Sequence, residues 1–312
     1  MPPSDRAYLL VSPCRNEAAF MRRTLDSVIA QYLRPALWVI VDDGSTDATP
    51  EILADYAAKH DWIRVVQKPD RGHRAVGPGV IEAFYAGLET VSLGDYPYLC
   101  KLDLDLDLPP GYFQGLIERM EANPRIGTCS GKPYMRRGEA LVSERRGDEM
   151  SAGMTKFYRT ECFEAIGGFV REVMWDAIDC HKARSLGWVA ISWDDPEMRF
   201  EHLRPMGSSQ QSIWAGRRRH GHGQWFMGSD PLYYLATCVF RMAEPPYVLG
   251  GLAMLQGYVG ACLRRERQLE DPELVTFIRA YQRRALFVGK SRVVAEIEAE
   301  REDVWRATTT SA

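Results

Sequence analysis

The sequence lacks the cysteine patterns of disulfide-rich and zinc-binding proteins. Its seven cysteines are odd in number, are scattered along 312 residues and include no CxxC pair. Secreted disulfide scaffolds pair an even number of cysteines, and structural zinc sites use closely spaced ligands. Neither a disulfide framework nor a zinc site is therefore expected, and a reducing cytosol fits this cysteine content best.

The chain also lacks a strong charge of either sign and a secretion signal. Its 39 lysines and arginines against 42 acids leave a formal net charge of −3. This balance gives no electrostatic basis for a nucleic-acid partner. The N-terminal stretch MPPSDRAYLLVSP has neither the basic start nor the long apolar core of a secretory signal, so we expect it to lead directly into the first strand.

Long hydrophobic runs are scarce as well. The apolar run that ends at Leu263 is about 17 residues long, the lower limit for a spanning helix, and it contains Gln256 and four glycines. We therefore do not expect it to cross a membrane. With 46% hydrophobic and 26% charged residues, the chain has enough apolar content for one large core and a smaller appendage.

The first two hundred residues contain short apolar runs that alternate with helical patterns, which is typical of a mostly parallel α/β sheet. We predict strands at 8–12, 37–41, 63–67 and 98–102, separated by helices near 17–31, 48–59 and 75–91. In such sheets, ligands bind beyond the carboxyl ends of the strands. Polar clusters follow all four predicted strands, at 13–17, 42–47, 68–74 and 103–107.

The run KLDLDLD at 101–107 alternates acids with leucines. On a strand, this alternation places the carboxylates of Asp103, Asp105 and Asp107 on one side and the leucines on the other. Hard cations such as Mg²⁺ and Mn²⁺ bind carboxylate oxygens and commonly keep positions for water and phosphates. The run therefore indicates a metal site, and an acidic loop after a strand is the structural alternative.

The segment VDDGSTD at 41–47 follows the second predicted strand. Asp42 and Asp43 are suited to accept hydrogen bonds from a base N–H or a ribose hydroxyl, while Gly44 permits the turn and Ser45 or Asp47 can cap the next helix. No GxGxxG follows the first predicted strand, which disfavours a nicotinamide or flavin Rossmann domain.

Four motifs, taken in order, resemble those of the family 2 glycosyltransferases, inverting enzymes with the GT-A fold. They are PxxNE at 13–17, VDDGSTD at 41–47, KLDLDLDLPPGYF at 101–113, and GGF at 167–169 followed by WDAID at 175–179. The resemblance implies a GT-A domain at 1–205, with a mostly parallel nucleotide-sugar-binding sheet flanked by helices, and a C-terminal helical region at 206–312. It also implies a nucleoside diphosphate sugar donor and a divalent metal, Mg²⁺ or Mn²⁺.

The same resemblance assigns roles on the donor side. Pro13, Asn16 and Glu17 fall in the first nucleotide-binding turn, and Asp43 matches the acid that contacts the base. Two further sets of residues match motifs near the diphosphate. They are the DxD pair Asp103 and Asp105, the first near ribose and metal and the second a direct metal ligand, and the basic residues Arg71 and Arg74 beside the donor phosphates. A register shift to Asp105 and Asp107, and a solvated basic loop at 71–74, are the respective alternatives.

On the acceptor side, the resemblance makes Asp176 the catalytic base, with Asp179 as the alternative because Trp175 stands where glutamate is expected. Trp175 itself either stacks against an acceptor sugar or packs in the interior. His202 is a candidate metal ligand. In the string QQSIW at 210–214, Ile213 replaces the arginine of the QxxRW motif of processive synthases, so we expect transfer of a single sugar.

The sequence therefore predicts inverting, metal-dependent transfer of one sugar to an acceptor hydroxyl, in polysaccharide, glycolipid or lipid-linked glycan synthesis. A metal-dependent sugar-phosphate nucleotidyltransferase is an alternative, but a glycine- and arginine-rich loop is expected where this chain has CRNEAAF, at 14–20. A non-catalytic nucleotide-sugar-binding module is a further alternative, and it would not need both a DxD pair and an acid near 176.

The C-terminal region predicts two apolar helices, near 231–240 and 246–263, with arginines on both sides. Such helices suit the interface of the cytoplasmic membrane, close to a lipid-linked acceptor. The alternative is a helical appendage packed on the catalytic domain or at a homodimer contact. We expect 268–305 to form solvated helix, and the protein to be cytoplasmic, peripheral at the inner face of that membrane.

Overall fold

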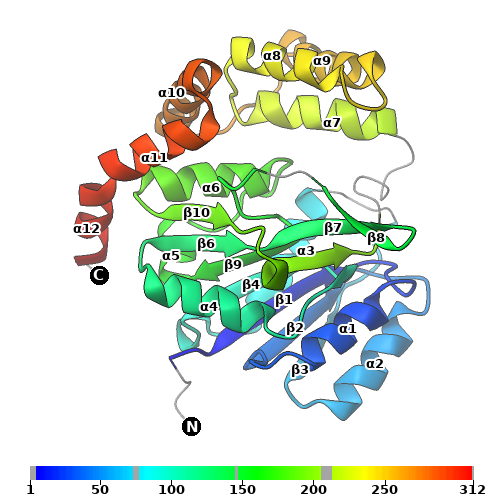
Figure 1. The fold of residues 1–312 in the computed structure, drawn as a ribbon. Coiled ribbons are helices and arrows are strands. Elements are labelled where there is room, and N and C mark those ends of the chain that lie inside the picture. Colours follow the sequence, from blue (N-terminus) through cyan, green and yellow to red (C-terminus); the bar gives the residue numbers. More distant parts are fainter. Residues whose placement is uncertain (1–4, 73–76, 145–146, 205–212, 311–312) are drawn as a thin grey trace. The chain divides into compact units, whose positions relative to one another are not determined.

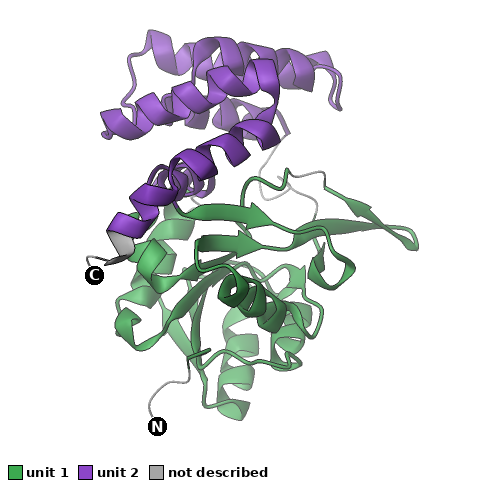
Figure 2. Cartoon of the chain, turned by 60° about the vertical axis from the view of Figure 1, so that its left-hand side comes forward, with its two compact units in different colours: residues 1–169, 188–205 green, residues 170–187, 206–312 purple. Residues whose placement is uncertain are grey.

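A computed structural model of the chain describes residues 5–72, 77–144, 147–204 and 213–310. The chain divides into two compact units (Figure 2). Unit 1 comprises residues 1–169 and 188–205, and unit 2 comprises residues 170–187 and 206–312.

In its described residues, unit 1 contains a seven-stranded sheet in the order β10-β6-β9-β4-β1-β2-β3 (Figure 1). β1 pairs in parallel with β2 and β4, β2 with β3, and β10 with β6, whereas β9 runs antiparallel to both β4 and β6. The strands are β1 (Tyr8–Cys14), β2 (Leu37–Asp42), β3 (Ile63–Gln67), β4 (Tyr98–Leu102), β6 (Ile126–Ser130), β9 (Thr155–Arg159) and β10 (Val189–Ser192).

Alternating apolar residues bury both faces of this sheet. Leu10 and Ile40 lie in a large core with side chains of the helices that cover one face. The neighbouring residues Val11 and Val39 point to the other face, where Gly87 lets a helix approach the sheet closely. The helices of unit 1 are α1 (Met21–Ile29), α2 (Thr49–Lys59), α3 (Pro78–Leu88), α4 (Tyr112–Ala122) and α5 (Thr160–Ala165), with 3-10 turns η1 (Leu93–Asp95) and η2 (Pro196–Met198).

The sequence correctly predicted the core of unit 1. The four expected strands are β1 to β4, and α1, α2 and α3 occupy the three expected helical segments. The expectation of a mostly parallel α/β sheet flanked by helices is confirmed.

A second sheet was not predicted. In the described part of unit 1 it has the order β5-β11-β7-β8, formed by β5 (Leu106–Asp107), β7 (Lys132–Arg137), β8 (Ala140–Ser143) and β11 (Arg199–His202). β5 pairs antiparallel with β11, and His202 lies opposite Leu106. This pairing brings the acidic run after β4 beside a histidine about a hundred positions later in the chain.

Unit 2 is helical in its described residues. Its helices are α6 (Trp175–Ser185), α7 (Ile213–Phe226), α8 (Pro231–Arg241), α9 (Val248–Leu263), α10 (Pro272–Val288), α11 (Lys290–Glu300) and α12 (Glu302–Thr310). Glycines allow α7 and α9 to pack backbone to backbone. A Cβ at Gly221 would lie 2.0 Å from the Met254 carbonyl oxygen, and one at Gly257 would lie 2.0 Å from that of Arg218.

The expected domain boundary at 205 coincides with the end of unit 1, but residues 170–187 fall in unit 2 rather than in the first domain. The reason is the packing of α6. The His181 ring lies 5.1 Å from the Tyr281 ring of α10, and the segment that ends α6 places Gly187 against Trp305 of α12.

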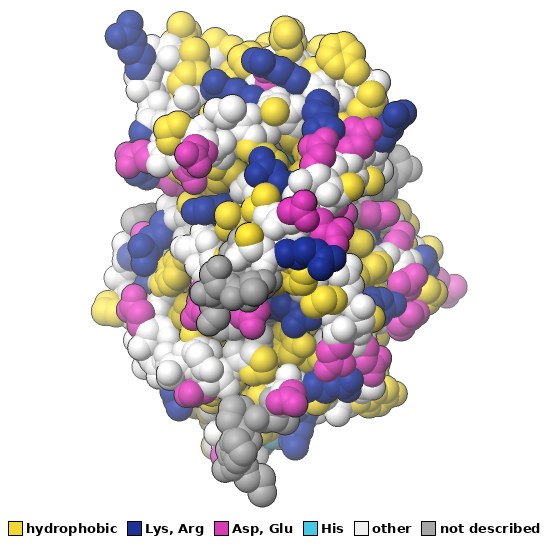
Figure 3. Space-filling model, turned by 90° about the vertical axis from the view of Figure 1, so that its left-hand side faces the viewer, with side chains coloured by type: hydrophobic (Ala, Val, Ile, Leu, Met, Phe, Trp, Pro, Cys, Tyr) yellow, Lys and Arg dark blue, Asp and Glu magenta, His cyan; other side chains and the backbone are white. Residues whose placement is uncertain are grey.

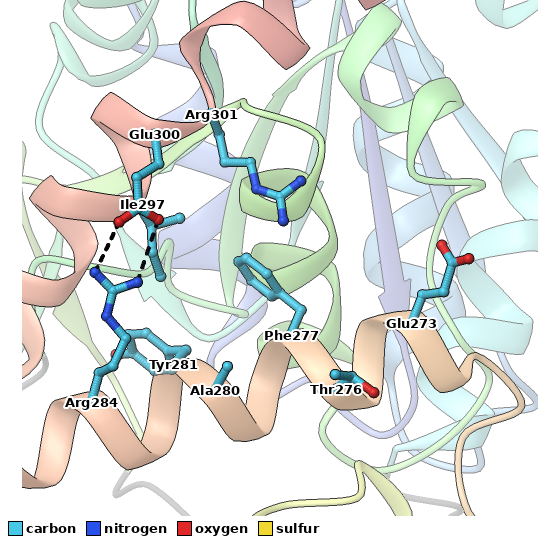
Figure 4. A pocket seen from close by; sticks show the side chains of 9 residues that line it. All are labelled: Glu273, Thr276, Phe277, Ala280, Tyr281, Arg284, Ile297, Glu300 and Arg301. Carbon is cyan, nitrogen blue, oxygen red and sulfur yellow. Dashed lines mark hydrogen bonds and ion pairs between the residues drawn. The ribbon is translucent and has the colours of Figure 1, made fainter.

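The expectation of solvated helix at 268–305 was too simple. α10 and α11 share a core of five buried side chains, Tyr281, Ala285, Val293, Val294 and Ile297. These helices also line a pocket of about 280 Å³, across which Arg284 Nη2 pairs with Glu300 Oε1 at 3.1 Å (Figure 4). Within the described residues, no helix combines the length and the apolar character needed to cross a membrane.

Candidate active site

The carboxyl ends of β1 and β2 lie side by side, because Cys14 pairs with Asp42 in the sheet register. Asn16, with a left-handed φ of 55°, joins the two loops. Its Oδ1 accepts a hydrogen bond from the Thr46 amide at 2.8 Å, and its own amide donates to Ser45 Oγ at 2.9 Å. The predicted nucleotide turn at Pro13, Asn16 and Glu17 is therefore held against the VDDGSTD segment.

The two acids of VDDGSTD have different environments. Asp42 Oδ1 accepts a hydrogen bond from the Ser45 amide at 2.9 Å, so this side chain stabilises its own turn. Asp43 Oδ1 lies 2.6 Å from Arg71 Nη2 and 3.3 Å from Lys68 Nζ. Asp43 and Arg71, which the sequence predicted from separate motifs, thus meet at one point, where an acid and two cations face the ends of β2 and β3.

At the end of β4, Asp103 contacts a buried lysine. Lys101 has only 2% of its side chain exposed, and its Nζ donates hydrogen bonds to Asp103 Oδ1 and to the Gly153 carbonyl. Burial raises the pKa of Asp103, the charge of Asp105 adds to the rise, and Lys101 opposes it. The Asp103 carboxylate is thus held at the strand end beside a second acid.

Asp105 lies at the centre of a second cluster, formed with His202, Arg204 and Glu17. Asp105 Oδ2 is 3.1 Å from Arg204 Nε and 3.7 Å from His202 Nε2, and Arg204 also pairs with Glu17. The other oxygen, Oδ1, is buried without a hydrogen-bond partner among the described residues. Arg204 therefore joins the end of β1 to the acids that follow β4.

His202 is held between two acids. Its Nδ1 lies 2.8 Å from Glu144 Oε1, on the side of the ring opposite Asp105. Burial alone would lower the pKa of His202, but the neighbouring carboxylates of Asp105 and Glu144 raise it to about 9.

The side chains around Asp105 offer ligand atoms of the kind that bind Mg²⁺ and Mn²⁺. Asp105 Oδ1, which is buried without a hydrogen-bond partner among the described residues, and the Asp103 carboxylate are hard ligands. The His202 imidazole is a borderline ligand once it has lost its second proton. In the described residues, however, no group of three or more His, Cys, Asp or Glu side chains is arranged to hold a metal by itself. The side chains present therefore fit a cation only if it takes its remaining ligands from water or from another bound molecule.

Asp107 lies apart from this cluster. Its side chain is 37% exposed and pairs with Arg23 Nη2 at 2.5 Å. The geometry therefore favours Asp103 and Asp105 over the shifted register at Asp105 and Asp107.

The predicted acceptor-side residues begin α6 in unit 2. Asp176 lies in the first turn of α6 and is partly exposed. Asp179 is only 2% exposed, and its Oδ1 accepts a hydrogen bond from the Cys180 amide. This favours Asp176 over Asp179 as a group that meets substrate. Trp175 is 8% exposed, which favours the packing alternative over stacking on a sugar.

Some predicted residues lie outside the described residues, namely Arg74, Gln210 and Gln211. Sequence reasoning missed the cations Lys68, Lys101 and Arg204 and the acid Glu144. Lys101 carried a signal, since a lysine inside a run that otherwise reads as a buried strand needs an acid nearby. Glu144 and Arg204 lie in segments whose partners depend on the second sheet, so no local pattern marked them.

Comparison with curated proteins gives relatives that are much longer than the matched region. The chain is 30% identical over 135 residues to a poly-beta-1,6-N-acetyl-D-glucosamine synthase of Staphylococcus epidermidis, which covers 42% of this chain and 29% of that protein. A poly-beta-1,6-N-acetyl-D-glucosamine synthase of Staphylococcus aureus is 26% identical over 132 residues, with the same coverage. The chain thus spans less than a third of these relatives.

Solved structures resemble nearly the whole chain. The mannosyltransferase PcManGT of Pyrobaculum calidifontis, in complex with GDP-Man and Mn²⁺, has a TM-score of 0.50 at 18% identity and covers 97% of this chain and 86% of its own. Residues 1–349 of S. aureus TarS, in complex with UDP-GlcNAc, have a TM-score of 0.52 at 15% identity and cover 98% and 91%. At this identity, these likenesses show the fold alone, which is the expected GT-A type.

The family model for glycosyl transferase family 2 matches residues 10–170, more than half of the chain. The match includes the ends of β1, β2 and β4, where the predicted donor-side acids lie. The chain therefore belongs to glycosyl transferase family 2.

Proposed function

We propose that the protein transfers a single sugar from a nucleoside diphosphate sugar to an acceptor hydroxyl, with inversion and with the help of a divalent metal. The observation that carries this proposal is the Glu17–Arg204–Asp105 bridge. The bridge links acids from the ends of β1 and β4. The other oxygen of Asp105 is buried without a hydrogen-bond partner among the described residues, at the sheet edge where α/β proteins bind nucleotides.

On the donor, Asp43 contacts the nucleotide base from its place beside Arg71 and Lys68, in the turn built by Pro13, Asn16 and Glu17. These two cations, together with Arg74, offset the charge of the diphosphate. PcManGT and TarS, which share this fold, are described with GDP-Man and UDP-GlcNAc, and this supports a nucleotide sugar as the donor class.

Asp105 and His202 would hold the metal, Mg²⁺ or Mn²⁺, and Asp103 would contribute near the metal and the ribose. When bound, the metal neutralises charge on the diphosphate leaving group. Glu144 fixes the His202 ring from the far side, at 2.8 Å. Arg204 exchanges its contact with Asp105 for a donor phosphate, which its planar guanidinium suits.

Asp176 acts as the base that takes the proton from the acceptor hydroxyl. Attack from the face opposite the leaving nucleotide inverts the anomeric carbon. Ile213, in place of the arginine of the processive synthases, supports release after one sugar.

The acceptor belongs to polysaccharide, glycolipid or lipid-linked glycan synthesis, and the enzyme acts in the cytoplasm. The support for this class is the match to a synthase of poly-beta-1,6-N-acetyl-D-glucosamine. The acceptor is a sugar or a lipid-linked sugar.

The first test is a thermal-shift screen of UDP, GDP and the other nucleoside diphosphates, each with and without Mn²⁺. A ligand that binds only the folded state raises Tm by an amount that grows with its concentration relative to its Kd. We expect one nucleotide to raise Tm strongly, and only with the metal present. Equal shifts with EDTA would contradict the metal assignment.

A second test separates the alternative functions by their products. A glycosyltransferase releases a nucleoside diphosphate from the donor, whereas a nucleotidyltransferase releases pyrophosphate from a nucleoside triphosphate. A binding module releases neither. Pyrophosphate release without nucleoside diphosphate would overturn the proposal.

A further inference from the structure

The outer face of the helix pair α8–α9 is apolar. On α8, Leu232, Val239 and Phe240 are 70%, 57% and 66% exposed, while Tyr234 and Cys238 fill the buried side. On α9, Leu249, Val259 and Leu263 are 59%, 42% and 78% exposed. A surface helix of a soluble protein normally presents polar side chains outward. Contiguous exposed apolar surface of this kind marks an interaction site.

Figure 3 shows one face of the molecule, on which hydrophobic side chains and Lys or Arg side chains lie together at the top. Arg264 and Arg265 directly follow Leu263, and Arg241 ends α8 directly after Phe240. The apolar face of α8–α9 is thus bordered by arginines at helix ends, of which Arg241 pairs with Glu244 and Arg264 pairs with Glu266.

A pocket of about 260 Å³ lies between α7 and α9, lined by Ala215, Arg218, Arg219, His222, Gly257 and Arg264. We call it the α7–α9 basic pocket. It forms because Gly257 brings the α9 backbone against α7, so that arginines of both helices reach the same space. Arg264 belongs to this pocket and also borders the apolar face.

The pocket has more positive than negative charge. Glu266 contacts Arg264 Nε at 2.6 Å and His222 Nε2 at 2.7 Å. Neither Arg218 nor Arg219 forms an ion pair with any residue that the structure describes, and Arg219 Nη1 is buried without a hydrogen-bond partner. Burial lowers the pKa of Arg219. An anion at this point would supply the missing hydrogen bonds.

The pocket between α10 and α11 provides a contrast within the same unit. There Arg284 pairs with both Glu296 and Glu300, at 2.9 and 3.1 Å, so its charge is already balanced (Figure 4). An unbalanced basic pocket is therefore a particular property of α7–α9 rather than of arginine-rich helices in general.

We propose that unit 2 docks on an anionic phospholipid surface, with the apolar face of α8–α9 at the boundary between headgroups and acyl chains and a lipid phosphate in the α7–α9 basic pocket. A bilayer surface offers both an apolar layer and phosphates, and it meets both features at once. A second copy of the chain would bring the same arginines to this face, so like charges would oppose it. The proposal is independent of the transferase reaction.

The experiment measures binding of the full chain to phosphatidylcholine vesicles with and without phosphatidylglycerol. We expect binding to the vesicles that contain phosphatidylglycerol and at least about tenfold weaker binding to pure phosphatidylcholine. Because the Debye length falls from about 10 Å at 0.1 M to about 3 Å at 1 M salt, high salt should release much of the protein. Protein that stays in the supernatant with anionic vesicles at low salt overturns the proposal.

Variants test each half of the surface. Phe240→Glu should weaken binding strongly, and Arg218→Gln and Arg219→Gln by about fivefold each, since one basic residue near an anionic leaflet contributes about 1 kcal/mol. The matched controls are Phe287→Glu, at an 87% exposed phenylalanine of α10, and Arg292→Gln, at an exposed arginine of α11. Circular dichroism checks that each variant is folded, and equal losses in variants and controls would overturn the proposal.

Two further experiments test whether another molecule occupies the α7–α9 basic pocket or the apolar face of α8–α9. Calorimetry with inorganic phosphate and pyrophosphate tests the pocket alone; tight binding of either, without vesicle binding, would assign the pocket to a free anion and overturn the proposal. Sedimentation velocity tests self-association; a dimer that Phe240→Glu dissociates, again without vesicle binding, would assign the apolar face to a second copy.

Discussion

At the scale of single residues, the two carboxylate oxygens of Asp105 have different environments. One oxygen faces Arg204 and His202, and the other is buried without a partner in the described residues. Burying a carboxylate oxygen without a hydrogen bond costs free energy unless a ligand supplies the missing contact.

We expect Asp105→Asn to lower the affinity for the nucleoside diphosphate in Mn²⁺ by at least roughly tenfold, the range seen when groups that support a metal are changed. The physical reason is the loss of a charged ligand to a hard cation while the side-chain volume is kept. Isothermal titration with and without Mn²⁺ measures the effect.

Asp107→Asn is the matched control, because Asp107 is two positions away but pairs with Arg23 at the surface. An exposed ion pair contributes little, so this variant should bind nucleotide like the parent. The reverse pattern would move the metal site to Asp107.

A second prediction concerns the base. Asp176→Asn should leave nucleotide affinity unchanged and lower turnover by a factor on the order of 10² to 10⁴, the usual range for a positioned general base. Asp179→Asn alters a buried side chain in the same helix, so we expect it to affect stability instead. Steady-state kinetics and thermal unfolding of both variants measure the difference, and a turnover defect in Asp179→Asn alone would reassign the base.

The sequence was informative about site residues that directly follow a strand. Pro13, Asn16, Asp43 and Asp103 lie within a few positions of a strand end, and parallel strands place their ends at one edge. Arg204 pairs with Glu17, which is 187 positions away, and that contact depends on the path of β11. No local pattern reports a partner at such a separation.

At the scale of elements, the same distinction holds. β1 is buried at every position, and a short, mostly apolar run of this kind predicts a buried strand. β8 is a short, mostly exposed strand and β5 has only two residues, so neither is long enough to predict the second sheet from the sequence. Both exist because a neighbouring strand supplies their hydrogen bonds.

The third prediction concerns the α7–α9 pair. Gly257→Ala would put a methyl group 2.0 Å from the Arg218 carbonyl oxygen, so the helices must separate. Overpacking of this kind typically costs about 1–3 kcal/mol. We expect a corresponding loss in the free energy of unfolding of unit 2, measured by urea denaturation.

Gly260→Ala, one turn further along the same helix, is the control. Its Cβ would meet only the end of the Arg264 side chain, at 3.2 Å. Removing a glycine from a helix interior favours the helix by up to about 1 kcal/mol, so this variant should be neutral or stabilised. Equal destabilisation by both substitutions would contradict close packing at Gly257.

At the scale of the whole molecule, the chain crosses between the two units three times. Residues 170–187 belong to unit 2, residues 188–205 return to unit 1, and the rest of the chain belongs to unit 2. A protein ended at residue 205 would keep α6 without α10 and α12. We expect such a fragment to bind an apolar dye more strongly than the full chain, because the α6 side chains that contact Tyr281 lose their cover. Fluorescence of the dye at equal protein concentration is the measurement.

The matched control replaces residues 170–187 of that fragment with a glycine–serine linker. If α6 is the source of the dye signal, the linker should reduce it. A fragment whose signal is unchanged by the linker would show that the loss of α10 and α12 is not what exposes it.

The insertion of α6 into the sequence of unit 1 also sets an order of events during synthesis. Unit 1 is complete once residue 205 has been made, but α6 must wait for α10, which begins at Pro272. At roughly 5–20 residues per second on the ribosome, the 67 residues from 205 to the start of α10 take about 3–13 s. During that time the nascent chain contains α6 but not α10, so slower translation lengthens the period in which α6 has no partner helix.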